Sequence, residues 1–278
     1  KSTRCGDNFF LESQKRNYDK RKNEKKSSMV FTSKLKKILI TGSSSRFCKF
    51  LKKDLEKHNC FFPSKKVFNI LDYKKMDFFL KKKGITHLIH IAGLSRPMNM
   101  HEKDINKSIE LNIVATANLV RLCNKYNIKI IYFSSNYVYP GNKGNYKETD
   151  SLLPINNYAW SKLGGEASVH LYENSLILRL CMTDYPFVHK KAIKGAKSSF
   201  IFNKSVSRLI PYLLDEKGII NIGGKKRDIF DFAKKFSSKK IESISVKEIN
   251  NFPINSSLNI NKLNKIFKKK IKLTNFKF

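Results

Sequence analysis

Long apolar runs, metal-binding motifs and acidic residues are all scarce in this chain of 278 residues. No apolar run approaches the roughly 20 residues that a bilayer-spanning helix needs, so we expect no membrane segment and a cytoplasmic protein. The five cysteines show no Cys-x-x-Cys spacing and the six histidines show no His-Glu-x-x-His spacing. We therefore predict reduced cysteines and no metal site.

Positive charge is in large excess, because 56 lysines and arginines face only 22 aspartates and glutamates, giving a formal net charge of +34. A basic surface attracts phosphate polyanions in a salt-dependent way. The lysines are scattered through every segment, however, and arginine is scarce, whereas an RNA-binding surface more often gathers arginines and aromatics in one patch. We interpret the charge as a general lysine excess and expect nucleic acid to bind only by nonspecific electrostatics.

The chain divides by pattern into three parts. Residues 1–34 are polar, charged and without apolar periodicity, which predicts a disordered basic tail; Met29 is a candidate natural start. Residues 35–182 alternate short apolar strands with amphipathic helices, including one long helix over 104–126. Residues 183–278 are less regular and predict a small substrate-binding lobe, with 218–236 returning to the sheet of the preceding part.

A tyrosine and a lysine four residues apart form the most specific motif. Tyr158 and Lys162 share one face of a predicted helix and can act as a coupled proton-transfer pair. A predicted strand over 130–133 precedes them and opens into Ser134 and Ser135, and an earlier strand ends in Gly42. Strands that run into small-residue turns and then helices indicate a nucleotide-binding parallel sheet. We therefore predict an α/β fold, a Rossmann-type doubly wound parallel sheet.

In this order the motifs resemble the extended short-chain dehydrogenase/reductase family, within the epimerase/dehydratase superfamily, and its dTDP-4-dehydrorhamnose reductase-like sugar-nucleotide enzymes. The resemblance covers residues 36 to about 270. It rests on these segments: Ile40-Thr41-Gly42, Asn69-Ile70-Leu71-Asp72, His90-Ile91-Ala92-Gly93, Asn112 with Thr116-Ala117-Asn118-Leu119, Phe133 to Tyr139, and Pro154 to Glu166.

The resemblance implies a catalytic set of Ser135, Tyr158 and Lys162. Tyr158 would give a proton to the substrate carbonyl oxygen, and Ser135 would hydrogen-bond the same oxygen. A free phenol has a pKa near 10, so the ammonium of Lys162 would be needed to stabilise the phenolate. Lys162 would also bind the nicotinamide ribose, and Asn112 would support the lysine.

The cofactor loop departs from the family pattern Gly-x-x-Gly-x-x-Gly, because the series here is Gly42, Ser45 and Cys48. Serine at a position that needs a positive φ would be strained, and Arg46 could compensate by neutralising phosphate. Basic residues after the second strand, with no acid, favour NADPH, while NADH is left open. The expected cofactor contacts are Gly42, Ser45, Arg46, Lys65, Asn69, Ala92, Gly93, Asn112, Tyr158 and Lys162.

The resemblance implies reduction of the 4-keto group of a nucleotide-activated deoxysugar for polysaccharide biosynthesis. Asn136, Tyr185 and Arg208 are the substrate candidates. A sugar-nucleotide epimerase is the nearest alternative, whereas a dehydratase is disfavoured because Ser135-Asn136 supplies no carboxylate. A non-catalytic dinucleotide-binding subunit, similar to the β subunit of methionine adenosyltransferase, and an RNA-binding member of the superfamily are kept as further hypotheses. A homodimer is left open.

Two other residues are predicted to lie outside the chemistry. We expect Glu166 to make a helix-stabilising contact, since it follows the Tyr158 and Lys162 motif on the same helix. We expect His101 to be an exposed loop histidine.

Overall fold

The computed structural model describes residues 35–250 and 252–272. The predicted tail over residues 1–34 lies outside the described residues. Residues Leu35–Phe267 form one compact unit, and the description below concerns that unit and the helix that leaves it. Within the described part of the chain, no helix is both long enough and apolar enough to cross a membrane.

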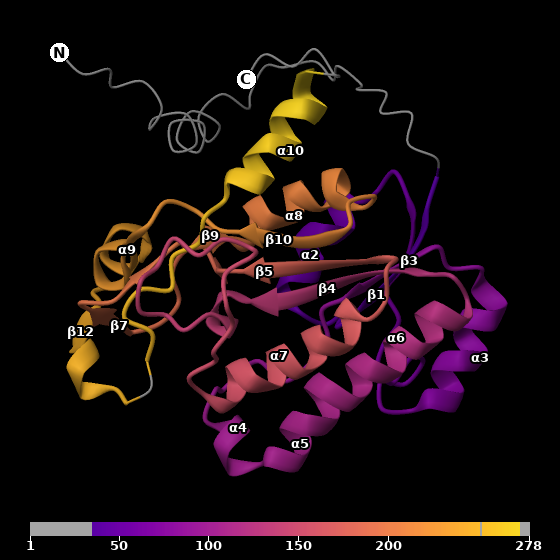
Figure 1. Cartoon of the computed structure of the whole chain (residues 1–278), viewed down its shortest axis with the longest axis horizontal. Coiled ribbons are helices and arrows are strands. Elements are labelled where there is room, and N and C mark those ends of the chain that lie inside the picture. The colour runs from indigo at the N-terminus through magenta and orange to yellow at the C-terminus, as the bar shows by residue number, and fades with distance from the viewer. Residues whose placement is uncertain (1–34, 251, 273–278) are drawn as a thin grey trace. The chain divides into compact units, whose positions relative to one another are not determined.

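A six-stranded parallel sheet forms the centre of the protein (Figure 1). Its order is β10-β5-β4-β3-β1-β2, and every neighbouring pair is parallel. The predicted doubly wound parallel sheet is thus confirmed. The order reverses between β1 and β3, and ligands of such sheets bind where the strands end at this reversal. The strand bounds are β1 Lys37–Thr41, β2 Asn59–Phe61, β3 His87–His90, β4 Lys129–Ser135, β5 Ser175–Leu180 and β10 Gly218–Ile222.

Helices cover both faces of this sheet (Figure 1). On one face α2 (Arg46–Asp54) and α8 (Asn203–Leu213) bury residues such as Leu51 and Ile210 against β1, β4, β5 and β10. On the other face α3 (Tyr73–Lys83), α6 (Ala115–Lys125) and α7 (Asn157–His170) bury residues such as Leu80, Leu119 and Val169. Burial on both faces explains why these strands are almost continuously apolar.

The helix predicted over 104–126 is interrupted. It consists of α5 (Ile105–Ile109), a π-helical turn η1 (Glu110–Val114) and α6, and it follows the short α4 (Met100–Lys103). Asp104 caps α5, because its carboxylate accepts a hydrogen bond from the Lys107 backbone N–H at 2.9 Å. Asn112 lies in the π-helical turn, and such turns occur frequently at functional sites.

The chain after β5 builds a smaller group of elements beside the sheet. Phe187, Phe232 and Ala233 form part of its own apolar cluster, and β10 (Gly218–Ile222) returns to pair with β5. The division into separate domains near residue 183 stays a prediction. The remaining bounds are β6 Met182–Thr183, β7 Lys191–Lys194, β8 Lys197–Ser198, β9 Ile201–Phe202, β11 Arg227–Asp228, α9 Ile229–Phe236, β12 Glu242–Ser245 and α10 Asn261–Lys272, with 3₁₀ turns η2 Asn136–Val138 and η3 Val246–Glu248.

Candidate active site

The predicted catalytic residues come together where β4 ends and α7 begins. Ser135 is the last residue of β4, and Tyr158 and Lys162 lie one helical turn apart in the first half of α7. Asn156 caps α7, since its side-chain oxygen accepts from the Ala159 N–H at 2.9 Å. The hydroxyl of Ser135 lies close enough to the Tyr158 phenol to lower its pKa. A strand end and a capped helix therefore place a hydroxyl pair at the edge of the sheet where ligands bind.

The charges around Tyr158 differ from those expected. Burial raises the pKa of Tyr158, while the hydrogen bond from Ser135 and the positive charge of Arg96 lower it. Burial also lowers the pKa of Lys162 to about 7, against a smaller opposing effect from the Glu166 carboxylate. The Lys162 ammonium lies 4.3 Å from the centroid of the Tyr132 ring. Burial thus weakens the preference of Lys162 for the ammonium form, and Arg96 is the cation whose charge lowers the pKa of the tyrosine.

Asn112 joins the loop after β3 to the catalytic helix. Its Oδ1 accepts from the Leu94 N–H at 2.7 Å, and its Nδ2 donates to the Leu94 carbonyl at 2.9 Å and to the Ser161 hydroxyl at 2.8 Å. Gly93 has a φ of +154°, and a Cβ there would come within 2.6 Å of Asn112 Oδ1. The predicted support of Lys162 by Asn112 is in this geometry indirect, through the neighbouring Ser161.

The turn after β1 tolerates the two residues that replace glycine. Gly42 has a φ of +74°, and a Cβ on it would lie 2.9 Å from the Ala92 backbone nitrogen. Ser45 has a φ of −67°, so the backbone strain expected of a serine does not arise. Its side chain instead caps α2 by accepting from the Cys48 N–H at 3.4 Å, and Cys48 is buried. Of the three positions Gly42, Ser45 and Cys48, only Gly42 is shown with a positive φ, and the predicted contact of this loop with a dinucleotide phosphate remains a prediction.

The loop after β2 lies beside this turn. The Ser43 hydroxyl donates to the Pro63 carbonyl at 2.7 Å, which brings the turn near the exposed Lys65 and Lys66 that follow. Asn69 closes a local turn by accepting from the Leu71 N–H at 3.2 Å. The predicted contacts of Lys65 with a 2′-phosphate and of Asn69 with adenine remain predictions.

The three substrate candidates lie in different settings. Asn136 is buried, and its Nδ2 donates to the Ser256 carbonyl at 3.1 Å, so this amide joins the site to the C-terminal segment. Tyr185 is exposed and packs edge-on against Phe202, with ring centroids 5.1 Å apart. Arg208 is exposed on α8. Their contacts with a substrate stay predictions.

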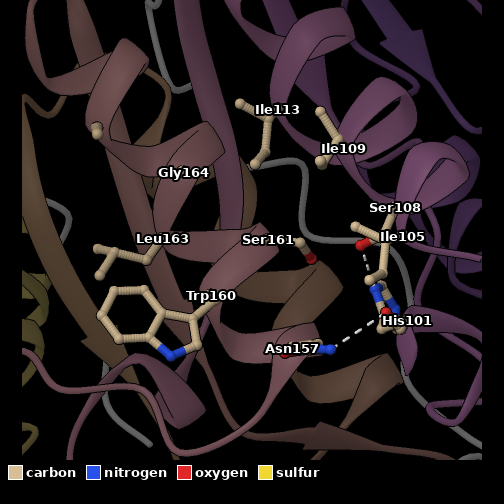
Figure 2. Close-up of a pocket in the computed structure, with 11 residues that line it drawn as sticks. His101, Ile105, Ser108, Ile109, Ile113, Asn157, Trp160, Ser161, Leu163 and Gly164 are labelled. Carbon is tan, nitrogen blue, oxygen red and sulfur yellow. Dashed lines mark hydrogen bonds between the residues drawn. The ribbon is translucent and has the colours of Figure 1, made fainter.

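His101 is buried, so its prediction as an exposed loop residue is wrong. It lies in α4, which packs on α7, and its ring meets the Tyr158 ring edge-on at 5.2 Å. Its Nδ1 is 2.6 Å from the Ser108 hydroxyl. His101 and Ser108 line a pocket of about 460 Å³ between α5 and α7. Figure 2 shows Trp160 on the side of this pocket opposite His101. No periodicity in the sequence indicates the four-residue helix α4 that covers this side of the tyrosine.

Glu166 and Arg179 form a buried ion pair between α7 and β5. Their side chains are 4% and 3% exposed, and Glu166 Oε1 accepts from Arg179 Nε at 3.0 Å. Glu166 Oε2 accepts from the Ser134 hydroxyl at 2.6 Å. The pair holds the catalytic helix against the sheet, in keeping with the structural contact expected of Glu166.

A charged group that no sequence motif predicted lies around Asp184, with Arg46 and Arg96. Asp184, just after β6, accepts ion pairs from Arg46 at 2.7 Å and from Arg96 at 3.7 Å. Arg46 was expected at a phosphate, and here it is paired with this carboxylate. The one sequence signal that could have pointed to Arg96 is its position six residues after the end of β3.

A family model described as the RmlD substrate binding domain matches residues 36–183, which is more than half of the chain. The chain belongs to this family. The β subunit of methionine adenosyltransferase 2 from Bos taurus is 29% identical over 150 residues, which cover 51% of this chain and 44% of that subunit. A dTDP-4-dehydrorhamnose reductase from Aggregatibacter actinomycetemcomitans is 28% identical over 151 residues, covering 53% and 51%. The chain thus matches about half the length of these curated relatives.

Solved structures show the same fold over more of the chain. A dTDP-4-dehydrorhamnose reductase from Bacillus anthracis, solved with NADP, superposes with a TM-score of 0.74 at 19% identity and covers 84% of this chain and 92% of its own. A hypothetical dTDP-4-dehydrorhamnose reductase from Sulfolobus tokodaii has a TM-score of 0.72 at 25% identity and covers 83% and 94%. The predicted resemblance to this group within the epimerase/dehydratase superfamily is confirmed.

Proposed function

We propose that the protein is an NADPH-dependent reductase that acts on the 4-keto group of a nucleotide-activated deoxysugar. The observation that carries the proposal is the position of Ser135 at the end of β4 and of Tyr158 and Lys162 one turn apart in α7, with the Ser135 hydroxyl acting on the pKa of Tyr158. Membership of the RmlD substrate binding domain family and the similarity to dTDP-4-dehydrorhamnose reductases support it.

The proposed chemistry divides among three side chains. A bound reduced nicotinamide would supply the hydride to the substrate carbonyl carbon. Ser135 holds the carbonyl oxygen, and Tyr158 gives it a proton from its phenol. Lys162, whose pKa burial lowers to about 7, would bind the cofactor ribose. The phenolate left on Tyr158 favours the ammonium form of Lys162, and solvent water supplies the proton that restores the phenol.

The residues around the cleft fit a nicotinamide dinucleotide. Gly42, with a φ of +74°, lets the backbone after β1 make the tight turn that packs against Ala92, and a tight turn before a helix N-terminus is the setting in which a pyrophosphate binds. The hydroxyl of Ser43 holds the neighbouring loop that carries Lys65 and Lys66, two cations suited to the 2′-phosphate of NADPH. The preference for NADPH over NADH follows from these lysines.

The test is turnover by the Tyr158→Phe variant on dTDP-4-dehydro-deoxysugars with NADPH. Loss of the phenol proton should lower kcat by about 10²-fold to 10⁴-fold, the usual range for a general acid, while NADPH affinity measured by calorimetry stays close to wild type. Tyr73→Phe, at the start of α3, removes the same hydroxyl outside the site and should retain activity. Full activity of Tyr158→Phe would disprove the proton-donor assignment.

A non-catalytic dinucleotide-binding subunit is the second candidate, because several relatives of similar identity are β subunits of methionine adenosyltransferase 2. The two candidates separate in the same experiment. Wild-type protein that binds NADPH but turns over no 4-keto sugar nucleotide would favour the regulatory subunit. An epimerase would instead convert a sugar nucleotide without net consumption of NADPH.

A further inference from the structure

Two arginines from different loops converge on one carboxylate at the edge of the site. Arg46 begins α2, and Arg96 lies in the loop after β3; they approach the same Asp184 oxygen at 2.7 and 3.7 Å. Their side chains are 61% and 50% exposed, while Asp184 is 12% exposed. One carboxylate therefore neutralises only one of two cations that face solvent, and the group keeps a net positive charge.

The carboxylate is held from its other side. Asp184 Oδ1 accepts from Asn203 Nδ2 at 2.7 Å. Asn203 is 9% exposed, and its Oδ1 is buried without a hydrogen-bond partner among the described residues. A buried amide oxygen without a donor is costly, so Asn203 is held in place by its hydrogen bond to Asp184 at the expense of its own acceptor.

The positive charges of the two arginines lower the pKa values of side chains around Tyr158. The charge of Arg96 lowers the pKa of both Tyr137 and Tyr158 against the larger opposite effect of their burial. Burial lowers the pKa of His189, and the charges of Arg96 and Arg46 lower it further. A phosphate bound between the arginines would thus change the charge that acts on Tyr158.

We propose that Arg46 and Arg96 form a diphosphate-binding subsite in which the Asp184 carboxylate occupies the anion position until a nucleotide displaces it. The inference rests on the proposed function for the identity of the ligand, a nucleoside diphosphate group. Guanidinium groups recognise phosphate oxygens through paired N–H donors. A phosphate group carries more negative charge than one carboxylate, so exchange satisfies both cations at once, and the freed Asp184 keeps its hydrogen bond from Asn203.

The diphosphate can come from the sugar nucleotide or from the cofactor, and calorimetric titrations distinguish the two. Arg46→Ala and Arg96→Ala should each weaken binding about tenfold or more, because a hydrogen bond to a charged group contributes about 1.5–3 kcal/mol and each 1.4 kcal/mol is tenfold. Loss confined to dTDP assigns the subsite to the substrate, and loss confined to NADPH assigns it to the cofactor. Arg121→Ala removes an exposed arginine on α6 and should match wild type.

Asp184→Asn is the decisive variant, because it removes the competing charge and keeps the shape that meets Asn203. It should tighten dTDP or NADPH binding several-fold, whereas a purely structural Asp184 would leave affinity unchanged or weaker. Thermal melting checks that each variant is folded. Unchanged affinity for both ligands in both arginine variants would overturn the subsite. Because the readout is binding, failure of the proposed reductase activity would leave this result intact.

Discussion

Gly165 is the position where one added methyl group should disturb the site most clearly. It lies in α7, where a Cβ would stand 2.5 Å from the Asn112 carbonyl oxygen and 2.6 Å from the Tyr132 hydroxyl. Backbone cannot move aside as a side-chain end can, so Gly165→Ala should cost about 1–3 kcal/mol of overpacking. Alanine favours a helix over glycine by about 1 kcal/mol, which offsets part of this. We expect a net loss of up to about 2 kcal/mol.

Gly164 provides a matched control one residue earlier in the same helix. A Cβ there meets the Cδ1 of Ile113 at 2.7 Å, which is the end of a flexible side chain. Figure 2 shows Ile113 and Gly164 at the same pocket, so the Ile113 side chain borders open space there. Gly164→Ala therefore keeps most of its helix gain and should be neutral or slightly stabilising.

Urea unfolding followed by circular dichroism measures this difference. Both variants carry the same helix-propensity gain, so the gap between their unfolding free energies isolates the contact and should be about 1–3 kcal/mol in favour of Gly164→Ala. Thermal melts should differ in the same direction, by roughly 2–4 °C per kcal/mol for a domain of this size. Equal stability of the two variants, or greater stability of Gly165→Ala, would refute the reasoning. Since Asn112 also holds the loop after β3, Gly165→Ala should further weaken NADPH binding.

Two further predictions concern buried charge and pH. Arg179→Met leaves Glu166 buried without its partner and should destabilise the protein by about 3–5 kcal/mol, and adding Glu166→Gln should recover part of this loss. Replacing the exposed pair Lys191 and Glu242 should change the free energy of unfolding by less than about 1 kcal/mol. Similar losses at the two pairs in urea unfolding would contradict this prediction. Burial lowers the pKa of His90 to about 3, below its value of about 6.5 in an unfolded chain. Between these two values the unfolded chain binds a proton at this residue and the folded chain does not. The stability from this histidine is therefore full above pH 6.5 and should fall toward pH 4 by up to about 1.4 kcal/mol per pH unit. His90→Gln should flatten this fall, and an unchanged slope would count against it.

Local sequence signals were sufficient for the elements of the fold. The apolar strands bounded by small residues, such as 37–41 and 129–135, and the amphipathic helices between them each carry their own pattern, so the parallel sheet followed from their alternation. The spacing of Tyr158 and Lys162 likewise fixed that both lie on one helix. The π-helical turn around Asn112 left no such trace, because its apolar periodicity resembles that of an uninterrupted helix.

The surroundings of these residues depended on contacts between distant segments. Whether Ser45 is strained depended on its backbone angles as the cap of α2, and the burial of His101 depended on α4 packing against α7. The meeting of Arg46, Arg96 and Asp184 joins three loops that are far apart in sequence. The sequence by itself determined the sheet, its helices and the residues offered for catalysis, since these follow from local periodicity and spacing. Only the tertiary structure decided which charges face them, because electrostatic effects depend on distance through space and on burial.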